Sequence, residues 1–162
     1  MSPTSDHPVR LESSMPRGIA AMLARLPVAD VSARFREYLD PVYAAARSGA
    51  IVLDGQNVFL YRGGSGDGVA EVAFGVGVAA PFAPVGSVQY VPLPVGPVAA
   101  TTHWGDYAGL GAAHAAVVAW CRANGQLLTS TRWEVYGHWN DDPAARKTDV
   151  YHLLADEQLA GG

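Results

Sequence analysis

The segment VAATTHWGDYAGLGAAHAAVVAWCRANG, residues 98–125, contains the clearest strand-to-helix transition in the sequence. Residues 98–103 are mostly apolar or β-branched and predict a strand. Asp106 is a good N-cap for the helix that follows, and Gly125 is a typical stop signal. Helical spacing gives this helix one face, made of Tyr107, Leu110, His114, Val117, Val118 and Cys121.

Two further strands are expected after this helix. The segments TRWEVYGHW (131–139) and KTDVYHLL (147–154) are rich in strand-forming residues. Residues 140–143, NDDP, lie between them and form a turn signal. The sequence therefore predicts a hairpin that completes the order strand, helix, strand, strand.

The first half of the chain begins with a segment of undecided type. Residues 18–26, GIAAMLARL, are mainly apolar, and so short a run is compatible with a helix or a strand. Asp30 then caps a helix that Gly49 ends. Pro41 lies inside this helix and predicts either a kink or a restart.

A hairpin is also expected in the first half. Residues 56–62 are rich in strand formers, and residues 69–81 follow them after a glycine-rich loop. Prolines then interrupt a connector that leads toward Val98. The first half can thus have the same order of elements as the second.

Landmarks in the two halves repeat at a nearly constant offset. Asp30 and Asp106 are 76 positions apart, as are Gly49 and Gly125, and Tyr61 precedes Tyr136 by 75. Such spacing suggests an internal duplication. We expect an α+β fold of two strand–helix–strand–strand modules related by a pseudo-two-fold axis. The expected modules have antiparallel sheets, helices on one face and a central ligand cleft.

The expected domain boundaries follow from this order. Residues 1–16 are polar and predicted to be only partly ordered, although residues 9–11 can add a short edge strand. One domain is expected over residues 17–154, with halves at about 17–80 and 88–154. Residues 155–162 are expected to form a tail.

Composition excludes several classes of protein. The 162 residues include 11 basic and 15 acidic residues, for a net charge of −4, and no basic stripe that would track phosphates. We therefore expect no direct contact with nucleic acid. No apolar leader and no run of roughly eighteen apolar residues occurs, so we expect a cytoplasmic protein without membrane contact. The single cysteine, Cys121, cannot form an internal disulfide.

Glu134 is the first candidate for a functional residue. Alternation along residues 133–139 places Trp133 and Val135 on one strand face, and Glu134, Tyr136 and His138 on the other. If helices cover the first face, the second presents a carboxylate beside an aromatic ring. Such a carboxylate can attract a lipophilic cation or act as a general base on water. An exposed, solvated glutamate is an equally weighted alternative.

Other candidates surround Glu134 in this interpretation. Tyr151 can close the same pocket from the partner strand, and Trp104 can overhang it. Glu71 occupies a similar place in the first half, and Tyr61 corresponds to Tyr136. Core packing is the alternative for the tyrosines, and a structural hydrogen bond is the alternative for His103. The full set of candidate ligand-binding residues is Glu134, Tyr136, Tyr151, Trp104, Tyr61, Glu71, His103 and Trp133.

Common cofactor and metal motifs are absent from the sequence. The five histidines show no zinc-binding spacing. The glycine-rich segments lack the features of a phosphate loop, a nucleophile elbow or a dinucleotide fingerprint. We therefore expect neither a metal nor a cofactor.

Several of these segments together carry a family resemblance. Residues 97–107 (PVAATTHWGDY), the helix with Trp120, and the strands at 133–136 (WEVY) and 148–151 (TDVY) resemble the GyrI-like effector-binding domain. The resemblance extends over about residues 17–154. It implies a duplicated fold with a ligand cleft, in which the family's central acidic residue falls on Glu134. Tyr136, Tyr151 and an aromatic residue near Trp104 would line that cleft.

The resemblance implies two functions. In multidrug-responsive regulators of this family, the domain binds hydrophobic, often cationic or aromatic, small molecules, and we expect binding of this kind here. Some stand-alone members hydrolyse the cyclopropane ring of DNA-alkylating natural products, which gives antibiotic resistance. In that alternative Glu134, with Tyr136, would activate water. The regulators' helix-turn-helix has no counterpart in this sequence, and a homodimer or a separate regulator protein is left open as partner.

Overall fold

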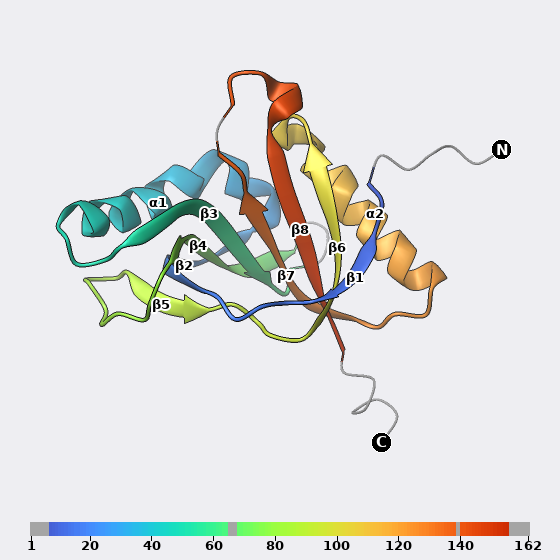
Figure 1. Ribbon diagram of the computed structural model, residues 1–162, viewed down its shortest axis with the longest axis horizontal. Coiled ribbons are helices and arrows are strands. Elements are labelled where there is room, and N and C mark those ends of the chain that lie inside the picture. The colour runs from blue at the N-terminus through green and yellow to red at the C-terminus, as the bar shows by residue number, and fades with distance from the viewer. Residues whose placement is uncertain (1–6, 65–67, 139, 156–162) are drawn as a thin grey trace. The chain divides into compact units, whose positions relative to one another are not determined.

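A computed structural model describes residues 7–64, 68–138 and 140–155 (Figure 1). The chain divides into two compact units. The N-terminal unit is Met15–Pro94, and the C-terminal unit combines Met1–Ser14 with Val95–Gly162. Each unit has its own helix and its own antiparallel strands, and each is described separately below.

Four strands form the sheet of the N-terminal unit. Its elements in chain order are β2 (Gly18–Pro27), a 3-10 turn η1 (Val28–Asp30), α1 (Val31–Arg47), β3 (Leu53–Arg62), β4 (Val69–Val78) and β5 (Gln89–Pro92). The strand order is β3-β4-β2-β5, and every pair is antiparallel. The expected hairpin is therefore confirmed as β3–β4, with β2 beside β4.

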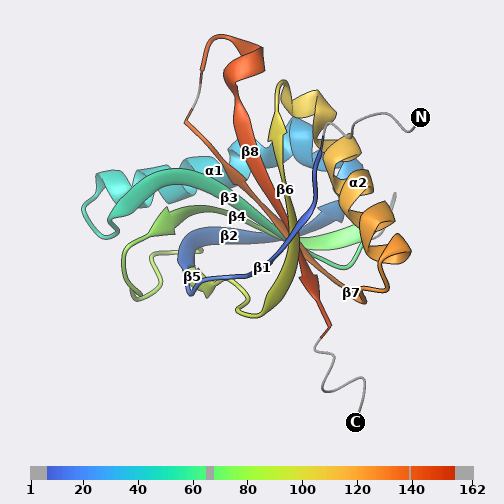
Figure 2. The ribbon, with the colours of Figure 1, turned by 45° about the vertical axis from the view of Figure 1, so that its right-hand side comes forward.

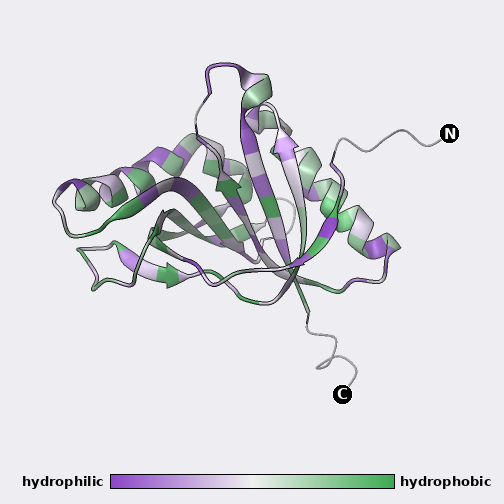
Figure 3. Cartoon of the chain, in the orientation of Figure 1, coloured by the Kyte–Doolittle hydropathy of each residue, from purple (hydrophilic) through white to green (hydrophobic). Residues whose placement is uncertain are grey.

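The helix α1 covers one face of this sheet. Hydrophilic and hydrophobic residues alternate along α1 (Figure 3), as expected for a helix with one buried side. Phe35 packs on Phe59, with ring centroids 5.9 Å apart, and Tyr38 stacks on Phe74 at 4.7 Å. The helix runs through Pro41 without a restart.

The undecided segment at 18–26 is a strand. Residues Gly18–Ala21 are fully buried, because β2 lies between β4 and β5 and α1 packs on it. A buried central strand is apolar on both faces, so it lacks the alternation that identifies a half-exposed strand. Strand β5 lies in the predicted proline-rich connector and pairs with Gly18–Ala21. No sequence pattern predicted β5, since a proline ends the strand.

The C-terminal unit also has four strands. Its elements are β1 (Arg10–Ser13), β6 (Pro97–Trp104), the 3-10 turn η2 (Tyr107–Gly109), α2 (Leu110–Ala123), β7 (Leu128–Tyr136), the 3-10 turn η3 (Pro143–Ala145) and β8 (Lys147–Leu154). The strand order is β1-β6-β8-β7, with every pair antiparallel. Strand β1 confirms the expected edge strand near residues 9–11.

The helix α2 covers one face of this second sheet and contacts β6 and β8 (Figure 1, Figure 2). Val117 and Cys121 pack with Ala99 and Leu154, while Leu110 and Ala113 pack on Val150. Asp106 caps the turn before the helix by accepting a hydrogen bond from the Ala108 N–H at 3.2 Å. The helix face predicted from Leu110, Val117 and Cys121 is therefore confirmed.

The protein has an α+β fold of antiparallel strands with two helices. The order strand, helix, strand, strand occurs once in each unit, as β2-α1-β3-β4 and as β6-α2-β7-β8. The pseudo-two-fold axis and the central cleft stay predictions. Within the described residues, neither helix is long and apolar enough to cross a membrane.

Candidate functional site

Glu134 lies on the sheet face that α2 covers. The carboxylate Oε2 of Glu134 is 2.7 Å from Nε2 of His114, which belongs to α2. Tyr136, two residues along β7, lies on the same face and packs with Leu110 of the helix. The pairing of Glu134 with Tyr136 is as predicted, but the face is not the open one. We expected helices to cover the face that includes Trp133 and to leave the Glu134 face open. Instead, α2 covers the Glu134 face.

A chain of hydrogen bonds holds Glu134 in place. The Tyr136 hydroxyl donates to Oε1 of Glu134 at 2.6 Å, and Nδ1 of His114 lies 2.8 Å from Nε2 of His152. Only 5% of Glu134 and 5% of His152 is exposed. A buried carboxylate requires donors of this kind to offset its lost hydration. Each of its oxygens accepts from a side chain of the same unit.

His152 remains neutral within this network. Burial, with the nearby charges of His114 and Arg132, lowers the pKa of His152 from 6.5 to about 3. Nε2 of a neutral His152 can accept the Nδ1–H of a charged His114, whose Nε2–H donates to Glu134. These hydrogen bonds tie α2 to β7 and β8.

Tyr151 is separated from Glu134 by the sheet. Tyr151 pairs in register with Trp133, and their rings stack with centroids 5.5 Å apart. Since neighbours in register share a face, Tyr151 lies on the side away from α2. Burial, followed by the charge of Asp149, raises the pKa of Tyr151. The prediction that Tyr151 closes a pocket around Glu134 is therefore wrong.

Trp104 and His103 are neighbours that point to opposite sides of β6. Trp104 is 61% exposed, and Nζ of Lys147 lies 5.9 Å from the centre of its ring. His103 is buried, with Nε2 2.8 Å from the Asp106 carbonyl oxygen and Nδ1 3.0 Å from Nε2 of His7. The structural hydrogen bond that was the alternative for His103 is present.

Tyr61 and Glu71 lie on opposite faces of the N-terminal sheet. Tyr61 is 6% exposed and shares the face of Phe59, which α1 covers. Glu71 is exposed and lies on the other face. Glu71 belongs to the second strand of its hairpin, whereas Glu134 belongs to the first strand of its own. The predicted correspondence of Glu71 with Glu134 is therefore wrong.

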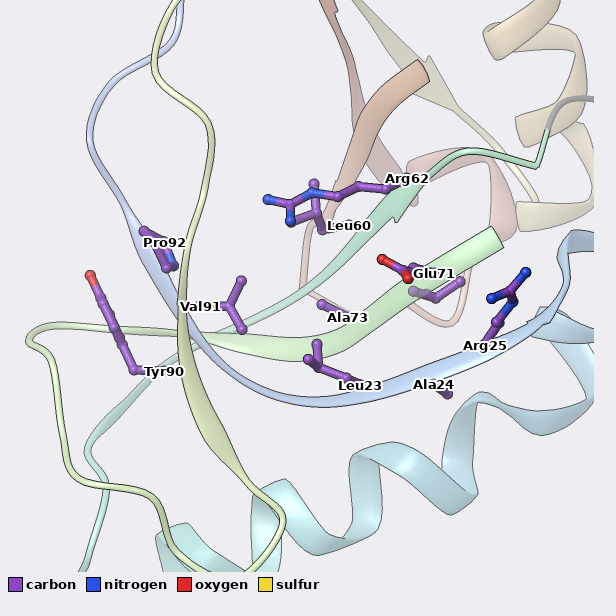
Figure 4. A pocket seen from close by; sticks show the side chains of 11 residues that line it. Leu23, Ala24, Arg25, Leu60, Arg62, Glu71, Ala73, Tyr90, Val91 and Pro92 are labelled. Carbon is purple, nitrogen blue, oxygen red and sulfur yellow. The ribbon is translucent and has the colours of Figure 1, made fainter. Parts of the chain in front are cut away.

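A groove of about 580 Å³ lies over the sheet face that includes Glu71 (Figure 4). Leu23, Leu60 and Ala73 occupy one row across β2, β3 and β4 and form its apolar floor. Val91 and Tyr90 of β5 line its side. Leu23 is 54% exposed although it is a large apolar residue. The volume is within the range of ligand pockets, roughly 300–1,000 Å³.

Three charged residues form one end of the groove. Arg62, Glu71 and Arg25 occupy the next row across β3, β4 and β2, and all three are exposed. In Figure 4 the Arg62 side chain extends across Leu60. Among the candidates predicted from the sequence, only Glu71 lines this groove. No set of three or more His, Cys, Asp or Glu side chains in the described residues is placed to hold a metal ion.

The sequence matches no family model and no curated protein. Several solved structures are nevertheless similar. The C-terminal domain of EcmrR superposes with a TM-score of 0.78 at 20% identity, over 93% of this chain and 98% of that one. SAV2435 bound to tetraphenylphosphonium gives 0.66 at 9% identity, over 94% and 96%. A hydrolase from Listeria innocua gives 0.61 at 11% identity, over 91% of both chains.

At such low identities the likeness concerns the fold alone. It is consistent with the GyrI-like effector-binding fold that the sequence resembles. The chain shares its α+β fold with the C-terminal domain of EcmrR and with SAV2435.

Proposed function

We propose that the protein binds a hydrophobic small molecule in the groove of its N-terminal unit. The observation that carries this proposal is the apolar floor, in which Leu23 is more than half exposed. Exposed apolar surface in a concave site with a few polar groups at one end is typical of ligand pockets. A ligand that covers Leu23 would remove this surface from water.

The fold comparison supports the same class of function. SAV2435 has this fold and was solved with tetraphenylphosphonium, a molecule of four phenyl rings around a phosphonium. Tetraphenylphosphonium is a hydrophobic cation, and the two chains are only 9% identical, so the comparison supports binding of a hydrophobic small molecule in general and neither a particular ligand nor a particular charge.

Glu134 is less well placed than the groove to meet a ligand. Its two oxygens accept hydrogen bonds from His114 and Tyr136 beneath α2. A cation or a water aligned for ring opening would have to compete with these donors. We therefore base the proposed function on the groove, and both the Glu134-centred cation site and the cyclopropane hydrolase stay predictions.

Substitution of the groove floor tests the proposal. The neutral fluorophore 1-pyrenebutanol would be titrated with the wild-type protein and with Leu23→Asn. We expect affinity to fall about tenfold in the variant, because the apolar contact of one leucine contributes roughly 1.5 kcal/mol or more. Leu127→Asn is the matched control, because Leu127 is 55% exposed and lies in the other unit. Equal affinities of the two variants, or no binding by the wild type, would contradict the proposal.

A further inference from the structure

We infer that the groove selects hydrophobic molecules that carry an anionic group, such as an aromatic carboxylate. This inference rests on the proposed function and adds the charge of the ligand. It follows from the row Arg62, Glu71 and Arg25, which forms the polar end of the groove.

The three charges lie close together on one face. Register places Glu71 opposite Arg62 on β3 and opposite Arg25 on β2. Adjacent strands are roughly 4.8 Å apart, so the three side chains start from neighbouring positions in one row, and no ion pair within the described residues joins either arginine to Glu71. Two positive charges and one negative charge leave an excess of one positive charge at this end of the groove.

In the part of the chain that the structure describes, neither arginine forms an ion pair. The ion pairs there involve Arg10, Arg17, Arg34, His114 and Lys147, and none involves Arg25, Arg62 or Glu71. A guanidinium presents two parallel N–H donors to a carboxylate and loses little hydration in doing so. Arg62 is therefore available to an anion whose apolar body lies over Leu60, the residue that its side chain crosses in Figure 4.

A cation of the same shape would meet a less favourable site. Glu71 attracts a cation, but both flanking arginines repel it. All three side chains are exposed, so each interaction changes affinity by only a few-fold. The preference is consequently a modest ratio between matched ligands, and added salt should reduce it.

Three pyrene derivatives with the same apolar body test the inference. 1-Pyrenebutyrate, 1-pyrenebutanol and 1-pyrenebutylamine carry a negative, a neutral and a positive end at neutral pH. Fluorescence titration of the full chain would give an affinity for each, with Leu23→Asn identifying binding in the groove. We expect the butyrate to bind about three- to tenfold more tightly than the amine, with the alcohol between them.

Charge-removing variants give the sign of each contribution. Arg62→Gln and Arg25→Gln should each weaken butyrate binding a few-fold, while Glu71→Gln should strengthen it and weaken amine binding. Arg47→Gln is the matched control, because Arg47 is an exposed arginine at the last residue of α1, away from the groove lining. It should leave all three affinities unchanged.

The outcomes separate the two proposals. Binding that depends on Leu23 but is equal for the three ligands, or tightest for the amine, would overturn the anion preference and leave the groove as a ligand site. Absence of any binding that depends on Leu23 would overturn the proposed function and this inference with it. An equal loss of butyrate affinity in Arg47→Gln and Arg62→Gln would also overturn the inference, since it would reflect net charge alone.

Discussion

Glu134 stabilises the packing of α2 on the second sheet. Its carboxylate accepts from His114 at 2.7 Å and from Tyr136 at 2.6 Å and is almost wholly buried. Glu134→Gln removes the charge and places an amide N–H₂ against one donor. We expect the free energy of unfolding to fall by about 1.5–3 kcal/mol, the usual size of a hydrogen bond to a charged group. Urea denaturation would measure the change.

The matched control for this variant is Glu37→Gln. Glu37 is exposed and pairs with Arg34, three residues earlier on α1. Such a surface pair contributes little to stability, because water screens both charges, so Glu37→Gln should change the free energy of unfolding much less than Glu134→Gln. The groove model also requires that Glu134→Gln leave pyrene affinities unchanged. Loss of binding in a variant that remains folded would instead favour the Glu134-centred site.

His152 should make stability depend on pH. Its pKa is lowered from 6.5 to about 3 by burial, His114 and Arg132. Between these two pH values, His152 is protonated in the unfolded chain and neutral in the folded chain. Stability is then full above pH 6.5 and falls as pH decreases toward 3. The loss is at most about 1.4 kcal/mol per pH unit from this group.

Comparison with His152→Gln isolates this contribution. The glutamine carbonyl oxygen can still accept from His114, but glutamine does not titrate. Urea midpoints at pH 7 and pH 5 should therefore decrease less in the variant than in the wild type. Equal decreases of the urea midpoint in both proteins would show that the pKa of His152 is not lowered by folding.

Strand β4 has a glycine, Gly75, that lies against the backbone of its neighbour β2. A Cβ at Gly75 would lie 2.8 Å from the carbonyl oxygen of Ala20 and 2.8 Å from Cδ1 of Ile19. Backbone of a paired strand cannot move away without breaking the ladder, so Gly75→Ala should destabilise by about 1–3 kcal/mol. Thermal unfolding would measure the effect.

Gly111 provides the opposite case on α2. A Cβ at Gly111 meets no atom within 4 Å. Alanine is favoured over glycine in helices by up to about 1 kcal/mol, so Gly111→Ala should raise the melting temperature. A fall in both variants would mean that the close approach at Gly75 is not the cause of its effect.

Sequence patterns predicted the helices and strands that are marked by nearby residues, such as a cap, a glycine stop, alternation or a turn. Asp106 caps the 3-10 turn that leads into α2, Gly125 follows the helix's C-cap, and alternation with a turn located the hairpin β7–β8. The apolar run of β2 left helix and strand open because Gly18–Ala21 is buried on both faces, and β5 lies among prolines. Their type is decided by pairing with distant strands, which no local pattern contains.

The candidate site was predicted less well for a related reason. Alternation correctly separated Trp133 from Glu134, but it does not state which face a helix covers. The contact of His114 with Glu134 settles that point. The groove is lined by Leu23 of β2 and Val91 of β5. The local pattern left β2 open between helix and strand, and β5 was not predicted. Glu71 was singled out, but for a correspondence with Glu134 that the strand order does not support.

At the scale of the whole molecule, the division into two units allows the ligand site to be located. A ligand stabilises the unit that it binds, and this stabilisation can be measured in each unit separately. A ligand that binds only the folded state stabilises it by about 2.7 kcal/mol at one hundred times its dissociation constant. Amides that exchange through unfolding of the bound unit gain protection by that amount. We expect 1-pyrenebutanol to protect the amides of β2, β3 and β4, which include the groove floor.

Hydrogen exchange with mass spectrometry would measure this protection in both units of the full chain. In Leu23→Asn the gain at β2–β4 should shrink, because the ligand concentration is then a smaller multiple of the dissociation constant. Leu127→Asn should keep it. If the N-terminal unit unfolds without the other unit, the ligand adds no protection to the amides of β6, β7 and β8. If the whole chain unfolds cooperatively, the amides of both units gain the same protection. A gain confined to β6–β8 would contradict the groove and place the ligand in the unit of Glu134.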